Sequence, residues 1–174
     1  MASHRSPASV QAVFAAQAQA RPDAAALLSG ERTLSYGALD ARADRLAARL
    51  AGLGVRAEEP VAVCSERSIE QLVALLAILK AGAAYLPLDP AWPDERLRFM
   101  LDDAGARVLL TSARRAPGGG VAHVLDLDEE LVAAGPGEPP RVPGSPERLA
   151  YITYTSGSTG TPKGVPVEPE VYVM

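Results

Sequence analysis

The chain has 174 residues, of which 48% are hydrophobic and 22% are charged, a composition typical of one soluble globular domain that buries its own core. Its formal net charge is −4, and its 17 Lys and Arg residues are interspersed among 21 Asp and Glu residues, which excludes a basic surface for nucleic acid. The longest apolar run, 72–79, is too short to cross a bilayer, and no secretory signal opens the chain. We therefore expect no nucleic-acid partner, no membrane partner and a cytoplasmic location.

The first third of the chain predicts a helix, a hairpin and a second helix. The first helix runs from about 8 to 20 and stops before Pro22, because the residue before a proline avoids the helical conformation. Two short strands flank a turn at 29–32. Ser35 then caps an amphipathic helix, whose apolar residues recur at three- and four-residue spacing until Gly54.

Strands and helices alternate along the middle of the chain. Ser68 and Gln71 predict a capping box for a helix that ends at Lys80, and Pro93 opens a helix that reaches about Asp103. Short apolar runs between these helices predict buried strands at 60–64, 85–88, 107–111 and 122–125. This rhythm is typical of βαβ units, so the predicted fold class is α/β, with a mainly parallel sheet.

The segment 135–147 interrupts the alternation, because eight of its thirteen residues are Gly or Pro. This composition disfavours both a helix and a strand ladder, so it predicts a Pro/Gly-rich surface connection inside a single domain. A further strand is predicted at 149–155. It leads directly into the most informative part of the sequence.

Residues 151–164 read YITYTSGSTGTPKG, and every residue from Thr155 to Thr161 is a glycine or carries a hydroxyl. Glycines let backbone N–H groups approach an anion, short hydroxyls add donors, and a lysine adds a compact positive charge. Lys163 supplies that charge, and Lys80 is the only other lysine beside 15 arginines. The segment therefore predicts a loop that binds a polyphosphate.

Two other interpretations of this loop compete with phosphate binding. A flexible Ser/Gly linker has a similar composition, but the strand directly before the loop and the stiffening Pro162 argue against it. A Walker P-loop needs Gly-Lys followed at once by Ser or Thr, whereas Lys163 lies between Pro162 and Gly164. The loop is therefore not that of a P-loop NTPase.

The string YTSGSTGTPKG at 154–164 resembles the phosphate-binding signature of the AMP-forming adenylate synthetases. This superfamily contains acyl-CoA synthetases, luciferases and the adenylation domains of nonribosomal peptide synthetases. Two upstream segments resemble the second and first core motifs of those adenylation domains, namely LKAGAAYLPLDP at 79–90 and LSYGALDARADRLAARL at 34–50. The chain is most similar to the amino-acid-activating branch.

The resemblance implies that residues 1–174 are the N-terminal part of an adenylation domain, ending just after the phosphate-binding loop. Such an enzyme uses ATP and Mg²⁺ to join a substrate carboxylate to AMP, and it releases pyrophosphate. Lys163 is implied to neutralise charge as pyrophosphate leaves. The residues implied to bind the β- and γ-phosphates of ATP are Thr155, Ser156, Gly157, Ser158, Thr159, Gly160, Lys163 and Gly164.

The family pattern covers about 10–165 and then breaks, so the substrate pocket and the C-terminal lysine domain have no counterpart in this sequence. We therefore expect the chain alone to be inactive, with no catalytic residue and no metal ligand of its own. It is expected to bind ATP or pyrophosphate weakly and to hold no cofactor tightly. Expected partners are the remainder of the adenylation domain or a carrier-protein module, and open strand edges predict self-association.

Two functional alternatives stay open at this point. One is a noncatalytic interaction or scaffold module derived from the same fold, and the other is part of an acyl-CoA synthetase-like ligase. The remaining reactive side chains have structural explanations. Cys64, the one cysteine, excludes an internal disulfide and is expected to be a small buried hydrophobe, and His123 is expected to be an ordinary strand residue.

Overall fold

The computed structural model describes residues 9–112, 120–133, 148–155 and 163–167. The helices within these ranges are α1 (Val10–Ala20), α2 (Tyr36–Gly52), α3 (Ile69–Lys80), α4 (Asp94–Ala104) and α5 (Leu127–Ala133). The strands are β1 (Ala25–Ser29), β2 (Arg32–Ser35), β3 (Pro60–Cys64), β4 (Ala84–Leu88), β5 (Val108–Thr111), β6 (His123–Asp126), β7 (Tyr151–Thr155) and β8 (Lys163–Val167).

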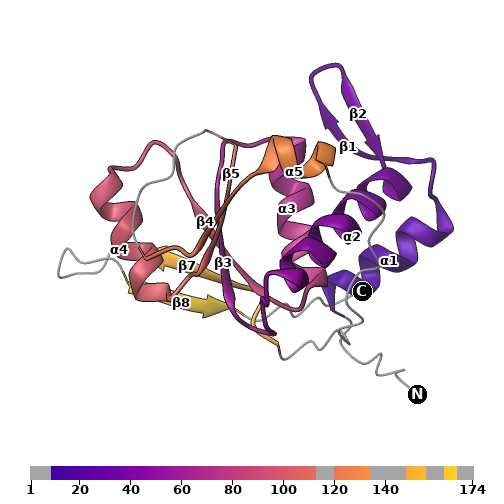
Figure 1. Ribbon diagram of the computed structural model, residues 1–174. Helices are drawn as coiled ribbons and strands as arrows, with labels where there is room; N and C mark the ends of the chain where they lie inside the picture. The colour runs from indigo at the N-terminus through magenta and orange to yellow at the C-terminus, as the bar shows by residue number, and fades with distance from the viewer. Residues whose placement is uncertain (1–8, 113–119, 134–147, 156–162, 168–174) are drawn as a thin grey trace.

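One sheet organises the described part of the molecule, with the strand order β6-β5-β3-β4-β7-β8. The strands from β6 to β7 are parallel, and β8 is antiparallel to β7 at the edge. Figure 1 shows α1, α2 and α3 on one side of this sheet and α4 on the other. The fold is α/β with a mainly parallel sheet, as predicted.

The order of the central strands explains why helices cover both faces of the sheet. The connection β3-α3-β4 steps to one side of β3, whereas β4-α4-β5 steps back across β3 to its other side. Crossovers between parallel strands are right-handed, so two crossovers that step in opposite directions place their helices on opposite faces. As a result, α3 and α4 enclose the same strands from opposite faces.

The side chains of β3 alternate between the two cores that result. Val61 and Val63 belong to the cluster formed with α2 and α3, whereas Ala62 and Cys64 belong to the cluster formed with α4. None of these four residues is more than 2% exposed. A strand that is buried on both faces needs a continuous apolar run, which is why 60–64 was recognisable in the sequence.

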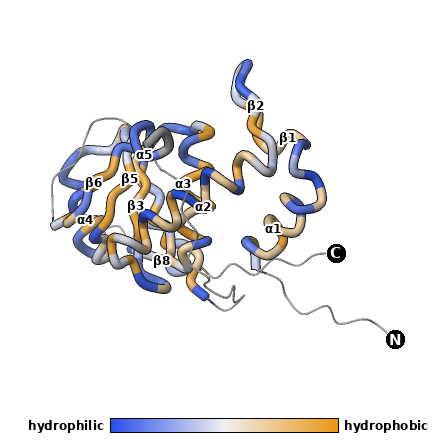
Figure 2. The backbone as a smooth tube through the Cα atoms, turned by 45° about the vertical axis from the view of Figure 1, so that its right-hand side comes forward, coloured by the Kyte–Doolittle hydropathy of each residue, from blue (hydrophilic) through white to orange (hydrophobic). Residues whose placement is uncertain are grey.

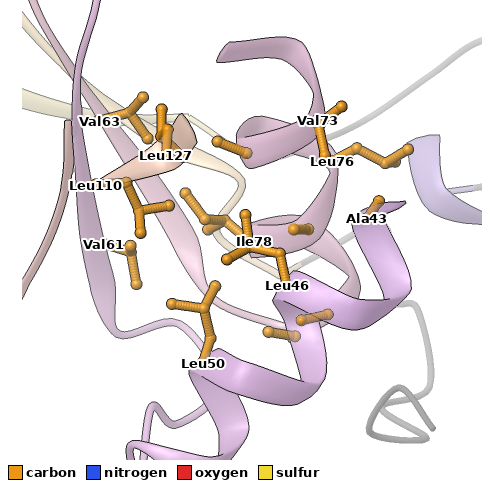
Figure 3. Packing of buried hydrophobic residues seen from close by; sticks show 14 of the residues in the cluster. Ala43, Leu46, Leu50, Val61, Val63, Val73, Leu76, Ile78, Leu110 and Leu127 are labelled. Atoms are coloured by element: carbon orange, nitrogen blue, oxygen red, sulfur yellow. The ribbon is translucent and has the colours of Figure 1, made fainter. Parts of the chain in front are cut away.

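The larger core lies between the sheet and the helices α2 and α3. In Figure 3, Leu46 and Leu50 of α2 point toward Ile78 of α3 and toward Val61 and Leu110 of the sheet. All five residues are fully buried. Burial of each such side chain stabilises the fold by about 1.5–3 kcal/mol relative to its exposure to water.

The helix starts confirm both predicted serine caps, and they correct one detail of the second. Ser35 Oγ accepts a hydrogen bond from the Ala38 N–H at 3.3 Å, as expected of an N-cap. Ser68 Oγ likewise accepts from the Gln71 N–H at 3.1 Å. The reciprocal bond of the predicted capping box, from the Ser68 N–H to the Gln71 side chain, is not formed among the described residues, where the Gln71 side-chain amide donates to the Ser65 carbonyl at 3.3 Å.

The β1–β2 hairpin is a separate antiparallel unit that projects from the body, with hydrophilic residues at its tip (Figure 2). Gly30 lies in the turn with a φ of +58°, a conformation that favours glycine. Arg32, directly after the turn, forms an ion pair with Glu70 of α3. This contact links the hairpin to the helix that covers the sheet.

Two observed elements were not predicted, namely α5 and β8. Helix α5 buries Leu127 in the larger core. Strand β8 contains Pro166, which has no N–H to donate and is therefore compatible only with an edge strand or the start of one. The predicted surface connection at 135–147 lies outside the described residues.

Candidate functional site

The β7–β8 hairpin brings the two ends of the predicted phosphate loop opposite each other. Strand β7 ends at Thr155 and β8 begins at Lys163, and these two residues pair across the strands. Both are exposed, as is Gly164. The connection 156–162 lies outside the described residues, and with it the predicted phosphate ligands Ser156, Gly157, Ser158, Thr159 and Gly160.

A cleft of about 610 Å³ lies at the same carboxyl edge of the sheet, where β3, β4 and β7 end. In the described part of the sheet, β4 pairs with β7 only at Tyr85 and Tyr151, whose rings are stacked with centroids 5.1 Å apart. Beyond this pair, Pro87 and Thr153 line the cleft instead of forming a further ladder pair. The carboxyl ends of parallel strands are where open α/β sheets bind ligands.

Polar and aromatic side chains line this cleft. Ser65 follows β3 and is 4% exposed, and its Oγ has no hydrogen-bond partner among the described residues. The Arg96 guanidinium lies 4.2 Å from the centre of the Trp92 ring, a cation–π contact beside the cleft. Sequence reasoning did not select these residues. For Ser65 and Trp92, the available signal was their position shortly after the predicted strands 60–64 and 85–88.

The two lysines have different surroundings. Lys80 Nζ donates to the carboxylates of both Asp40 and Asp44 in α2, and the distance to Asp40 Oδ1 is 2.5 Å. The two aspartates lie one helical turn apart, so a single ammonium bridges them and ties α3 to α2. Lys80 is therefore structural. Lys163 is exposed at the start of β8, directly beside the predicted loop.

Tyr154 anchors the strand that enters the loop. Its hydroxyl donates to Asp103 Oδ2 of α4 at 2.6 Å. Burial raises the pKa of the Tyr154 phenol far above its ordinary value, and the hydrogen bond to Asp103 and the negative charge of that carboxylate raise it further. The phenol therefore remains a neutral donor well into the alkaline range.

Comparison with known protein families shows to which family this chain belongs. The sequence profile of the family described as AMP-binding enzyme matches residues 14–173. The chain belongs to the AMP-binding enzyme family. The match includes the hairpin as well as the central strands, so the predicted phosphate loop lies within the family domain.

Known proteins identify the branch of the AMP-binding enzyme family. Malpinin synthetase from Mortierella alpina is 48% identical over 162 residues, which cover 90% of this chain and 2% of that protein. The solved N-terminal subdomain of Klebsiella oxytoca NpsA, in complex with 3-hydroxybenzoyl-AMSN, has 32% identity and a TM-score of 0.84, covering 92% of this chain and 41% of that chain. The AMPPNP-bound form of the nonribosomal peptide synthetase FmoA3 has 37% identity and a TM-score of 0.82, covering 94% of this chain and 18% of that chain.

The chain therefore corresponds to the N-terminal portion of a nonribosomal peptide synthetase adenylation domain, as the sequence motifs implied. It spans only 2% of malpinin synthetase and less than half of each solved chain named above. These relatives favour the adenylation-domain interpretation over the scaffold and acyl-CoA synthetase alternatives.

The other chemical expectations concern single side chains. Cys64 is buried in β3, and His123 is the first residue of β6, so both occupy the strands in which they were expected. In the ranges that the structure describes, no three His, Cys, Asp or Glu side chains are grouped so as to hold a metal ion. No helix in these ranges combines the length and the apolar character needed to cross a bilayer.

Proposed function

We propose that the β7–β8 hairpin binds the β- and γ-phosphates of ATP in an enzyme that adenylates an amino acid. The observation that carries this proposal is the pairing of Thr155 with Lys163 at the carboxyl edge of the sheet. It places a hydroxyl and an ammonium at the two ends of a connection composed of small hydroxyl residues, glycines and one proline. A solved relative, FmoA3, has been crystallised with the ATP analogue AMPPNP, which supports a nucleotide as the ligand.

The charge distribution supports Lys163 as the phosphate-binding cation. Lys80 is engaged by Asp40 and Asp44, whereas Lys163 is exposed and lies next to Gly164. An ammonium on a flexible stem supplies a compact positive charge, and charge-assisted hydrogen bonds to phosphate oxygens are stronger than neutral ones. The proposed phosphate ligands remain Thr155, Ser156, Gly157, Ser158, Thr159, Gly160, Lys163 and Gly164.

In the proposed reaction, a carboxylate oxygen of the substrate attacks the α-phosphorus of ATP. A carboxylate–phosphorus bond forms, the bond from the α-phosphorus to the bridging oxygen breaks, and pyrophosphate leaves with that oxygen. Binding of the departing phosphates by Lys163 and the loop stabilises the charge that accumulates on them. Mg²⁺, when bound with ATP, would neutralise part of the phosphate charge, and in the described ranges no three metal-ligating side chains are grouped to hold it without the nucleotide.

Titration of the ¹⁵N-labelled 174-residue chain with pyrophosphate tests the phosphate-binding part of this proposal. We expect a dissociation constant of roughly 1 mM, which corresponds to about −4 kcal/mol, because a single ammonium and several neutral donors would supply the contacts. Amide shifts should concentrate in residues 155–164. Binding should weaken with added salt, since exposed charges are screened over about 8 Å at physiological ionic strength.

Matched variants identify the residues that make the contact. Lys163→Ala should weaken pyrophosphate binding more than Ser158→Ala, because the first removes a full charge and the second removes one donor among several. Arg21→Ala removes a positive charge from an exposed residue directly after α1 and should leave binding unchanged. Equal responses to AMP and pyrophosphate, or shifts that spare the hairpin, contradict the proposal.

Expected partners follow from the two opposite edges of the sheet. The outer strands β6 and β8 carry exposed apolar side chains, with Val124 46% and Val165 41% exposed. Exposed strand edges pair readily with other strands, so we expect contact with further parts of an adenylation domain and self-association of the isolated chain. Light scattering that finds a monodisperse monomer would contradict self-association.

A further inference from the structure

Tyr154 is placed to control the geometry of the hairpin that carries the proposed phosphate loop. It immediately precedes Thr155, and its side chain reaches across to α4. The hydroxyl donates to Asp103 Oδ2 at 2.6 Å and lies 3.4 Å from the Met100 carbonyl oxygen. The 2.6 Å contact has the short length of a hydrogen bond from a hydroxyl to a carboxylate.

The same ring packs against the opposite strand. Tyr154 pairs with Gly164 across β7 and β8, and Gly164 directly follows Lys163. A Cβ atom added to Gly164 would lie 3.2 Å from Tyr154 Cζ and 3.3 Å from its hydroxyl oxygen. The ring therefore fills the space that a side chain at 164 would need, and it contacts both strands at the base of the loop.

Helix α4 is a firm support for this contact. It buries Leu97, Met100 and Leu101 in the core on its side of the sheet, and each of these side chains is at most 1% exposed. The helix ends at Gly105, whose φ of +67° is the left-handed cap conformation. Asp103 therefore projects from an element whose position is fixed by packing.

At its carboxyl end, strand β7 has a ladder partner on one side only, because Tyr154 and Thr155 pair with the edge strand β8. In the described part of the sheet, its ladder with β4 is limited to Tyr151 and Tyr85, and beyond that point residues of the two strands line the cleft. A strand end that is paired only with an edge strand is held to the rest of the fold through its side-chain contacts. The Tyr154–Asp103 hydrogen bond is such a contact, and it spans 51 residues of sequence.

We propose that Tyr154 and Asp103 are positioning residues for phosphate binding, which rests on the function proposed above. Their hydrogen bond fixes the end of β7 to α4, and the tyrosine ring transmits this position to Gly164 and Lys163. The pair has no direct contact with phosphate in this role. It reduces the freedom of Lys163 before a ligand arrives, which lowers the entropy lost on binding.

Hydrogen exchange in the ligand-free chain tests the positioning role without reference to any nucleotide. Tyr154→Phe keeps the ring and removes the hydroxyl, and Asp103→Ala removes the acceptor. In both variants we expect the amides of Thr155, Lys163 and Val165 to exchange about tenfold faster, as for loss of a hydrogen bond to a charged group, relative to the core amide of Val63. Asp103→Asn retains an acceptor oxygen and should restore most of the protection.

Tyr151→Phe is the matched control, because it removes a hydroxyl from the same strand on the opposite face of the sheet. Pyrophosphate affinity is the second readout, and it should fall at least about threefold in Tyr154→Phe while Tyr151→Phe stays at the wild-type value. Equal exchange in the two phenylalanine variants overturns the inference. Faster exchange without any change in affinity also overturns it, because the hydrogen bond is then merely structural.

The two proposals fail in distinguishable ways. A wild-type chain that binds no pyrophosphate contradicts the proposed function, and the exchange comparison then decides alone whether Tyr154 and Asp103 position the hairpin. A wild-type chain that binds pyrophosphate with an affinity unaffected by Tyr154→Phe leaves the function intact and removes the positioning role.

Discussion

The centre of the sheet and its β7–β8 edge differ in how their strands are covered. In β3, the residues from Val61 to Cys64 are at most 2% exposed, because helices pack on both faces. In β7 and β8, every residue is at least partly exposed, and Val165 is 41% exposed. The predicted phosphate loop thus connects two strands that have no fully buried residue.

This difference separates the source of stability from the proposed site of binding. Regions with few buried apolar contacts open locally at low free energy, and ligand-binding loops are drawn from such regions. The central strands supply a fixed frame, and the edge is held to it by a small number of contacts such as that between Tyr154 and Asp103. Substitutions at the centre should therefore change stability, and substitutions at the edge should mainly change phosphate binding.

The largest expected effect is from truncation of a side chain in the central core. Ile78→Ala removes a fully buried side chain between α3 and the sheet, and it should lower the free energy of unfolding by about 2–5 kcal/mol. Val165→Ala at the edge should lower it by less than about 1 kcal/mol, because that residue is already 41% exposed. Urea unfolding followed by circular dichroism measures both. Equal losses would abolish the distinction between centre and edge.

The two lysines give the next largest contrast. Lys80→Met should destabilise the fold by about 1–3 kcal/mol, because it leaves the Asp40 and Asp44 carboxylates one helical turn apart without their shared cation. Lys163→Met should change the free energy of unfolding by less than about 0.5 kcal/mol, since it removes an exposed side chain.

The control for the comparison of the two lysines removes the unpaired negative charges that Lys80→Met leaves on α2. Asp40→Asn and Asp44→Asn, combined with Lys80→Met, should recover part of the lost stability, because the repulsion between the two carboxylates is gone. Pyrophosphate titration should rank the two variants in the opposite order to stability. Lys163→Met should lose pyrophosphate binding, and a folded Lys80→Met should keep it. If Lys163→Met lowers the stability but leaves pyrophosphate binding unchanged, Lys163 is a structural residue and not the phosphate-binding cation.

Two glycines provide a smaller contrast of opposite sign. Gly164→Ala should destabilise the chain by about 1–2 kcal/mol, because its Cβ would lie 3.2 Å from a tyrosine ring that Asp103 holds in place. Gly52→Ala, at the end of α2, meets nothing within 4 Å and should stabilise the chain by about 0.5 kcal/mol through helix propensity. Thermal unfolding of the two variants should shift in opposite directions. Stabilisation by both substitutions would show that the Tyr154 ring is free to move away.

The sequence predicted the central part of the fold because local patterns and buried strands coincide there. Leu39, Ala43, Leu46 and Leu50 recur on one face of α2, and that face is buried. The sequence pattern did not predict an element that forms only through pairing with a neighbouring strand. Strand β8 has the composition KGVPV, which is a poor strand by propensity, and it forms through pairing with β7.

The candidate site was predictable only where its chemistry is local in sequence. The hydroxyl and glycine residues around Lys163 indicated phosphate binding directly, but their geometry from 156 to 162 is not described. The cleft lies beyond the pair of Tyr85 with Tyr151, and the contact between Tyr154 and Asp103 joins residues 51 positions apart. Neither feature has a signature within a short window, because both are set by the packing of the sheet against α4.

The smallest expected effect is a change in acid stability at the centre of the sheet. Glu59 precedes β3 and Arg107 precedes β5, and Arg107 Nε lies 2.6 Å from Glu59 Oε1. The hydrogen bond from Arg107 holds the pKa of Glu59 below its ordinary value of 4.5, and the Arg56 N–H assists, although partial burial opposes the shift.

The sign of this pH dependence follows from proton binding. Because the folded chain binds the Glu59 proton less tightly than the unfolded chain does, this carboxylate stabilises the fold above pH 4.5, and the contribution is lost as the pH falls through the lower folded pKa. Glu59→Gln should therefore flatten the fall in stability below pH 4.5, whereas Val165→Ala at the edge should retain the wild-type slope. The change should be smaller than the difference between the glycine variants, because solvent screens a partly exposed pair. Denaturant midpoints measured between pH 3 and pH 6 decide the matter, and identical slopes in wild type and Glu59→Gln would show that this pair does not hold the centre of the sheet.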